Sequence, residues 1–227
     1  MKAALIIVAS LLSIPADRFA MVWRPHTGQV LNYSMKFEGK LLESSFSIAA
    51  DVKLHVKKVE PSGDYTMGTS FKNMVTTFGG QTETNADPPE EVQKFSARGD
   101  LLDKTPAADQ SEDDAVGEII TRASDIPSPD KPVTIHEKWT HEFPEVKALG
   151  LPKGTGTYEI LEKSGTKLKV SVAYQEASGL DPTSAIGTTW VDASDFTPLS
   201  SESSIKNLRM SEGVPPATAK LTMKLKA

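Results

Sequence analysis

The residues best suited to metal chemistry are two histidines in the segment His136-Glu137-Lys138-Trp139-Thr140-His141. Zinc metalloproteases place two histidines at positions i and i+4 of a helix, which brings both imidazoles to one face. Here the histidines are five residues apart, and in a strand this spacing would put them on opposite faces. We therefore predict no metal site, and no cofactor, in this chain.

A serine nucleophile is the second chemistry to consider. The G-x-S-x-G turn of serine hydrolases is absent, and Ser-x-x-Lys spacings such as Ser164 to Lys167 lack the other motifs of penicillin-recognising enzymes. The chain has no cysteine, which removes thiolate nucleophiles, thiolate metal ligands and the lipobox of a bacterial-type lipid anchor. We predict that the protein is not an enzyme. The alternative is a hydrolase assembled from distant residues, with His136 or His141 beside an acid and a serine.

Two short motifs resemble ligand sites but have simpler explanations. The acidic stretch from Asp109 to Asp114 lacks the alternating oxygen ligands and central glycine of a calcium loop. Arg98-Gly99-Asp100 matches an adhesion tripeptide, yet a Gly-Asp pair between two strand patterns is typical of a hairpin turn. We interpret the first motif as the start of a helix and the second as a turn.

Alternation of apolar and polar residues with a period of two runs through most of the chain. It predicts strands over residues 31–38 and 46–57, with a bulge or strand end at Lys58-Val59 where the alternation shifts by one. Further strands are expected over residues 93–97, 101–105, 157–162, 168–174, 187–191, 199–208 and 217–225, and one begins at residue 65. The chain is therefore predicted to be mainly β, with a curved antiparallel sheet of half-barrel or barrel-like form.

One segment has the spacing of a helix. Apolar residues recur at intervals of three and four between Val116 and Ala123, behind acids that favour a helix N-terminus. The proline-rich stretch from Ile126 to Pro132 should end this helix as an exposed connection. We expect a single domain over residues 17–227. A weak internal repeat divides it into halves over 28–106 and 138–227, joined by a helix and a proline-rich connection over 107–137, and chance similarity of β hairpins is an equally good explanation of that repeat.

The composition and the first residues indicate a compartment. Residues 1–16 have one lysine, an apolar run and Ser13-Ile14-Pro15-Ala16, the layout of a secretory signal peptide, so we expect export to the periplasm or the extracellular space. No segment has the roughly 20 apolar residues of a transmembrane helix. The 25 basic residues, against 30 acidic ones, are scattered, which disfavours nucleic acid and anionic membrane as partners.

A long antiparallel sheet with one apolar face must cover that face, and a single helix shields only part of it. Either the sheet curls over itself, or it leaves a concave apolar groove for a lipid-like molecule or a peptide. The candidate ligand-binding residues on this face are Val52, Leu54, Met67, Val170, Val172 and Met223. The same positions also suit an ordinary packed core.

Several short motifs carry a resemblance to a known family. They are Gly28 to Tyr33, Lys138-Trp139, Gly154 to Ile160, and Trp190-Val191-Asp192 followed by Phe196-Thr197-Pro198-Leu199. Together they resemble a family of uncharacterised exported bacterial β proteins, although Asp195-Phe196-Thr197 replaces the usual turn glycine and no glycine precedes Trp139. The overall pattern is also similar to lipoprotein-carrier half-barrels, and that resemblance implies an acyl chain held on a concave sheet.

These observations favour a non-enzymatic extracytoplasmic binding or structural module, with a hydrophobic small molecule or an envelope protein as its partner. Two alternatives stay open beside it. One is a cell-envelope interaction module that uses its edge strands, and the other is the hydrolase with a non-contiguous site.

Overall fold

The structure is a computed structural model that describes residues 17–227 except 100, 105–111, 180, 211–213 and 227. The expected signal peptide over residues 1–16, Asp100 of the adhesion-like tripeptide and the first residues of the acidic stretch lie outside the described residues.

Twelve strands form one antiparallel sheet. They are β1 (Val30–Leu41), β2 (Ser44–Val59), β3 (Tyr65–Phe78), β4 (Gln81–Thr84), β5 (Glu91–Phe95), β6 (Leu101–Lys104), β7 (Lys138–Phe143), β8 (Gly154–Ser164), β9 (Lys167–Glu176), β10 (Ser184–Asp192), β11 (Pro198–Leu208) and β12 (Ala217–Leu225). The predicted fold class, a mainly β chain with a curved antiparallel sheet and one short helix, is confirmed.

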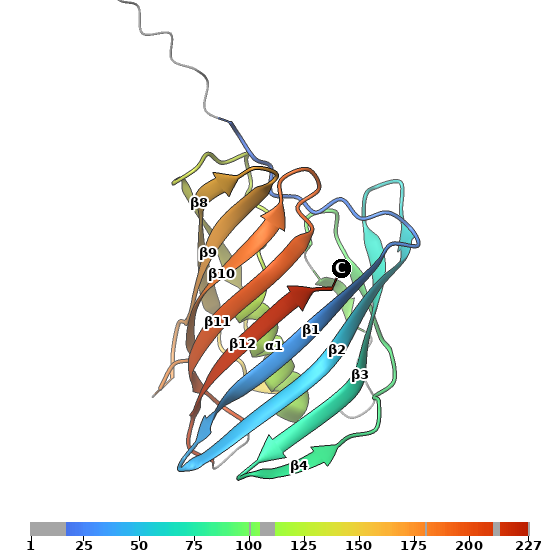
Figure 1. Cartoon of the computed structure of the whole chain (residues 1–227). Helices are drawn as coiled ribbons and strands as arrows, with labels where there is room; N and C mark the ends of the chain where they lie inside the picture. Colours follow the sequence, from blue (N-terminus) through green and yellow to red (C-terminus); the bar gives the residue numbers. More distant parts are fainter. Residues whose placement is uncertain (1–16, 100, 105–111, 180, 211–213, 227) are drawn as a thin grey trace, which may run out of the picture.

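The sheet is built from two meanders that meet in its middle. Its order is β6-β5-β3-β2-β1-β12-β11-β10-β9-β8-β7, with β4 paired to β3, so the first and last strands of the chain are neighbours. Figure 1 shows these strands wrapping around a concave side that holds the helix. No pairing among the described residues joins β6 to β7, so the sheet stays open along these edges.

The predicted alternation fits the observed strands. Along β2, Phe46, Ala50, Val52 and Val56 are buried on the concave face, which Ile48 and Leu54 share, whereas the odd-numbered residues from 47 to 55 point to the outer face. The phase shift expected at the end of this strand is confirmed, because the register with β3 shifts between Val56 and Lys58.

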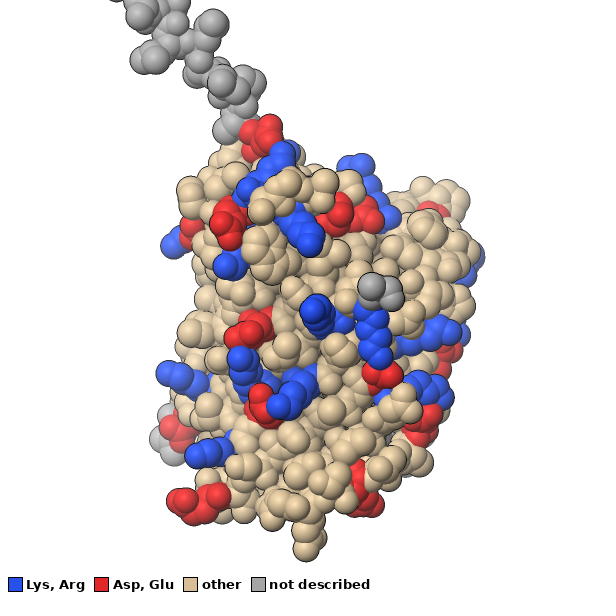
Figure 2. Space-filling model, viewed as in Figure 1, with Lys and Arg blue, Asp and Glu red and all other residues tan. Residues whose placement is uncertain are grey.

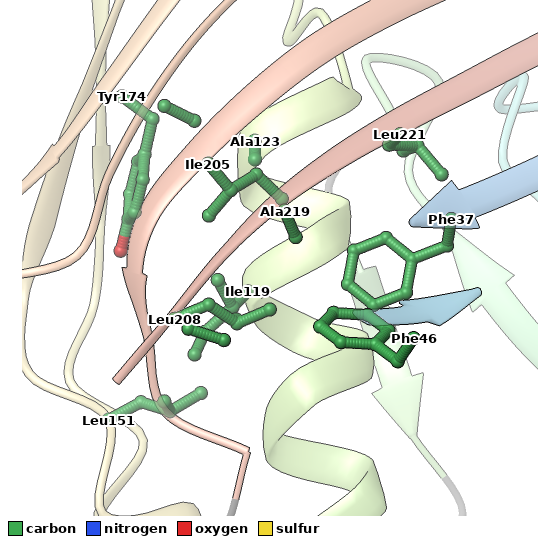
Figure 3. Close-up of a cluster of buried hydrophobic side chains, with 12 residues drawn as sticks. Phe37, Phe46, Ile119, Ala123, Leu151, Tyr174, Ile205, Leu208, Ala219 and Leu221 are labelled. Carbon is green, nitrogen blue, oxygen red and sulfur yellow. The ribbon is translucent and has the colours of Figure 1, made fainter. Parts of the chain in front are cut away.

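Helix α1 (Glu112–Ser124) lies on the concave face over β9, β10 and β11, as its predicted periodicity required. Small residues beneath its C-terminal end let it approach the sheet closely. Ser203 Oγ donates a hydrogen bond of 3.1 Å to the carbonyl oxygen of Ala123, and a side chain at Gly187 would collide with Ser203 and with the carbonyl oxygen of Glu202. Figure 3 shows Ile119 and Ala123 facing Ile205, Leu208 and Ala219 in the core that results.

A strap, defined here as residues 17–29, crosses one end of the sheet. Phe19 pairs with Val133, which directly follows the proline-rich stretch, and Arg24 N donates to the carbonyl oxygen of Asp195 in the β10–β11 turn at 3.1 Å. At the other side, Gly28 N donates to the carbonyl oxygen of Val56 at 2.8 Å. Figure 1 shows this first described segment running along the top of the view. The strap therefore ties the two meanders together across that end.

The prediction that the proline-rich stretch is an exposed connection is wrong for its middle. Ser128 is buried and donates a hydrogen bond to the carbonyl oxygen of Met21, while Trp139 Nε1 donates to the carbonyl oxygen of Pro127. Arg98, in the β5–β6 turn, reaches the carbonyl oxygen of Ser128 from the opposite sheet edge at 3.0 Å. The stretch is packed because it fills the gap between these edges.

Candidate functional site

The concave face has two parts that differ in how well they are covered. We define the filled half as the inward side chains of β8 to β11, which are almost completely buried: Tyr158, Ile160, Leu168, Val170, Val172, Val191 and Ile205. We define the open half as the half-buried apolar side chains on the same face of β1, β2, β3 and β12: Leu31, Met35, Ile48, Leu54, Met67, Phe71, Met74 and Met223.

The strand register shows how the open-half residues and their buried neighbours lie on one face. Met223 lies opposite Met35, which lies opposite Ala50, and in the neighbouring row Val52 lies between Tyr33 and Phe71. Side chains opposite one another in an antiparallel pair point to the same face and touch. The open half is therefore an apolar surface that spans four adjacent strands.

Methionine is concentrated in the open half. Met35, Met67, Met74 and Met223 are four of the seven methionines in the chain. The unbranched, polarisable thioether adapts to partners of varied shape, and proteins use it at binding surfaces that accept several ligands. This half is therefore suited to a flexible apolar ligand.

The six residues predicted to line a ligand site all lie on the concave face, but the structure separates them. Val170 and Val172 are in the filled half at 0% and 2% exposure, and Val52 is buried at 4%. Leu54, Met67 and Met223 are half-buried in the open half. Only these last three are placed to meet a ligand without displacing the core.

Sequence reasoning missed five members of the same surface: Leu31, Met35, Ile48, Phe71 and Met74. Met35 and Phe71 were visible in the alternation, but nothing in it distinguishes a half-covered position from a buried one. Met74 follows an irregularity, since the β2–β3 register shifts next to Asn73, which has a φ of 52°. That shift reverses the phase of the alternation and hides the face on which Met74 lies.

Arg122 locks the filled half to the helix. Its side chain is 1% exposed, and it donates from Nε to Glu118 Oε1 at 3.0 Å, from Nη1 to the carbonyl oxygen of Pro152 at 3.0 Å and from Nη2 to that of Pro144 at 2.9 Å. The guanidinium also lies 5.5 Å from the centroid of the Phe143 ring. Each of its three nitrogens donates a hydrogen bond within the protein, so it is a structural group.

A polar group lies between the end of α1 and strands β8 and β9. The hydroxyls of Tyr158 and Tyr174 are buried and have no hydrogen-bond partner among the described residues, and burial raises the pKa of both phenols. Asp125 keeps contact with solvent but is closely surrounded by protein, so that loss of hydration and the charge of Glu118 raise its pKa to about 7. This carboxyl titrates near neutrality.

The two histidines do not meet. His136 lies before β7 and its Nδ1 is 3.2 Å from Glu159 Oε1, whereas His141 packs edge-on against Phe143. Within the described part of the chain, neither imidazole forms a hydrogen bond with a serine, and no three His, Asp or Glu side chains gather as metal ligands. None of the described helices has the length and apolar character needed to cross a membrane.

Comparisons with known proteins bear on the fold. No family model and no curated protein matches the chain, so its membership of the exported β family stays a prediction. The chain is similar to a solved structure of lipovitellin that describes lipid–protein interactions, with a TM-score of 0.53 and 12% identity. The match covers 89% of this chain and 25% of the lipovitellin chain, so this chain spans about a quarter of it. At this identity the likeness shows the fold alone.

Proposed function

We propose that this protein is a non-enzymatic binding module that holds a hydrophobic, lipid-like ligand on the open half of its concave face. The observation that carries the proposal is the group of half-exposed apolar side chains on one face of β1, β2, β3 and β12, which lie next to buried neighbours such as Tyr33, Ala50 and Val52. Isolated exposed apolar residues are normal, but a contiguous concave set is typical of a binding surface.

The ligand class follows from the chemistry of this surface. Its members are aliphatic, thioether and aromatic, so it offers contact area but few directed hydrogen bonds to recognise a polar molecule. The similarity to lipovitellin, whose solved structure concerns lipid–protein interactions, supports the same class by fold analogy. An acyl chain, which is long, flexible and apolar, fits this description.

We place the protein outside the cytoplasm, because residues 1–16 have the layout of a signal peptide. We also propose that it acts without catalysis. The hydrolase alternative needs a histidine within reach of both a serine and a carboxylate, and among the described residues the imidazole of His136 forms a side-chain hydrogen bond only with the carboxylate of Glu159.

Titration of delipidated protein with a fluorescent fatty acid tests the proposal. Phe71 and Ser70 are adjacent on β3 but lie on opposite faces, because Phe71 pairs with Val52 and Ser70 with Lys53. Phe71→Glu should weaken uptake about tenfold or more, since it puts a carboxylate against the acyl chain. Ser70→Glu adds the same charge on the outer face and should leave uptake unchanged.

Two outcomes would overturn the proposal. One is the absence of saturable uptake by the delipidated wild-type chain, and the other is equal uptake by Phe71→Glu and Ser70→Glu. If Phe71→Glu does not fold, the wild-type chain is instead cross-linked with a photoreactive fatty acid and the labelled peptides are identified. Labelled peptides should then come from β2 and β3, and labelling confined to β8 and β9 would contradict the assignment.

A further inference from the structure

A surface pocket of about 390 Å³ lies at the end of the sheet crossed by the strap, apart from the open half. Three segments far apart in sequence form it: the strap, the end of β8 and the turn between β10 and β11. Its lining residues are Asp17, Arg18, Phe19, Ala20, Arg24, Lys163, Ala193, Ser194 and Phe196. Figure 2 shows Lys and Arg side chains interspersed with Asp and Glu side chains near the top of the view, just below the grey trace.

The pocket holds more positive than negative charge. Arg18, Arg24 and Lys163 line it against a single carboxylate, Asp17. Lys163 Nζ lies 2.8 Å from Asp17 Oδ2, so this pair is close to neutral. The remaining positive charge comes from the two arginines.

The two guanidinium groups are available to a ligand. Arg18 and Arg24 are exposed at the pocket, and within the described residues neither side chain forms an ion pair or a hydrogen bond. Glu137 feels the charge of Arg18, but its carboxylate accepts hydrogen bonds from Thr134 instead. Guanidinium groups match the geometry of phosphate oxygens and form paired hydrogen bonds with them.

The backbone that carries these cations is fixed before any ligand arrives. Arg24 N donates to the carbonyl oxygen of Asp195 at 3.1 Å, and Trp23 Nε1 donates to Thr197 Oγ1 at 3.1 Å. The turn itself is held by hydrogen bonds from Ser194 N to Asp192 Oδ1 and from Thr197 N to Asp195 Oδ1. Little ordering of the backbone is needed when an anion binds, which favours affinity.

We propose that this pocket binds a phosphate-type oxyanion through Arg18 and Arg24, beside the Lys163–Asp17 ion pair. The source of the phosphate is either a free phosphate ester or the headgroup of an anionic lipid. The scatter of basic residues along the sequence disfavours an anionic membrane as a partner. The fold nevertheless brings residues 18, 24 and 163 together in one pocket, so an anionic headgroup becomes a candidate ligand. The proposal does not depend on an apolar ligand in the open half.

The test compares the wild-type protein with two variants, each of which loses two positive charges. Arg18→Gln/Arg24→Gln removes the two available guanidinium groups, and Lys40→Gln/Lys206→Gln removes two exposed cations elsewhere. Calorimetric titration with inorganic phosphate should show saturable binding to the wild type that falls about tenfold in the arginine variant. The lysine variant should bind like the wild type.

Sedimentation with vesicles separates the two sources. Binding to phosphatidylcholine vesicles containing phosphatidic acid, but not to pure phosphatidylcholine, identifies the lipid headgroup if the arginine variant loses it. Phosphate binding without vesicle binding identifies the free anion. An equal loss in the lysine variant, or no saturable binding of either probe, would overturn the site. Fatty acid uptake should be unchanged in both variants, so failure here is distinct from failure of the open half.

Discussion

The filled half and the open half of the concave face have the same alternating strand pattern but differ in how deeply their inward side chains are buried. Leu168 and Leu54 both point inward from long strands, yet Leu168 is fully buried and Leu54 keeps contact with solvent. The difference lies in what covers them. The strap, the proline-rich connection and α1 pack on the filled half, whereas the described residues cover the open half only in part. Alternation in the sequence therefore identifies which residues share a face. The segments that pack on this face determine whether a residue is buried in the core or stays accessible to a ligand.

The largest effect is expected from truncating one leucine in each half. Leu168→Ala should lower the free energy of unfolding by about 3 kcal/mol, because it leaves a cavity in a packed core. Leu54→Ala should cost about 1 kcal/mol or less, since solvent already reaches that side chain. Urea denaturation measures both values, and equal losses would mean that the two halves are equally packed.

A second substitution tests the close packing of β10 against β11 beneath α1. Gly187→Ala should lower the free energy of unfolding by about 2 kcal/mol, because the new Cβ collides with Ser203 and the backbone of Glu202. Thermal melts would measure it, and uptake of fluorescent fatty acid should stay near the wild-type level. Loss of uptake would show that the filled half shapes the open half.

A third change concerns the pH dependence of the filled half. The pKa of Asp125 is raised to about 7, so its neutral form is favoured by folding. Its contribution to stability is complete below about pH 4 and is lost as the pH rises through about 7. As the pH rises across this range, the free energy of unfolding of Asp125→Asn should therefore increase relative to that of the wild type. The increase should be at most about 1 kcal/mol, because the carboxyl keeps solvent contact.

Chemical denaturation at pH 4, 6 and 8 measures this gain, with Glu43→Gln as a control at an exposed acid. A constant difference between Asp125→Asn and the wild type at all three pH values would contradict the raised pKa.

The smallest effect is expected at Gly117, which is exposed on α1. An added Cβ there meets no atom within 4 Å, so Gly117→Ala should raise the free energy of unfolding by about 0.5–1 kcal/mol through helix propensity alone. Differential scanning calorimetry would detect the shift. A destabilised variant would indicate that the outer side of α1 is in contact with another part of the chain.

Much of the fold could be predicted from sequence because it depends on local periodicity. The helix begins at Glu112 and ends at Ser124, close to its expected range, and β12 matches its predicted bounds of 217–225. The irregularity beside Asn73 was not predicted, since a non-glycine residue with positive φ leaves no reliable mark in the composition.

The site could be predicted only as a face. Val170 and Val172 look like Leu54 and Met67 in sequence, because all four lie in alternating strands. Their burial differs through segments that pack from far along the chain, such as Phe19 and Val133 in the same core cluster as Val170. Likewise, Arg24 and Lys163 share a pocket only after folding. Long-range packing of this kind is not encoded in any local pattern.

The pairing of β1 with β12 also has a consequence for how the protein is made. Tyr33 pairs with Leu225, so the middle of the sheet is a seam between the beginning and the end of the described chain. During synthesis β1 and β2 emerge early, yet one edge of β1 has no partner until β12 is complete. Pairing over such a sequence separation is slow. Until β12 is made, the newly synthesised chain therefore exposes the long edge of β1 that lies in the middle of the finished sheet. An exposed strand edge of this kind can pair with another chain and promote aggregation.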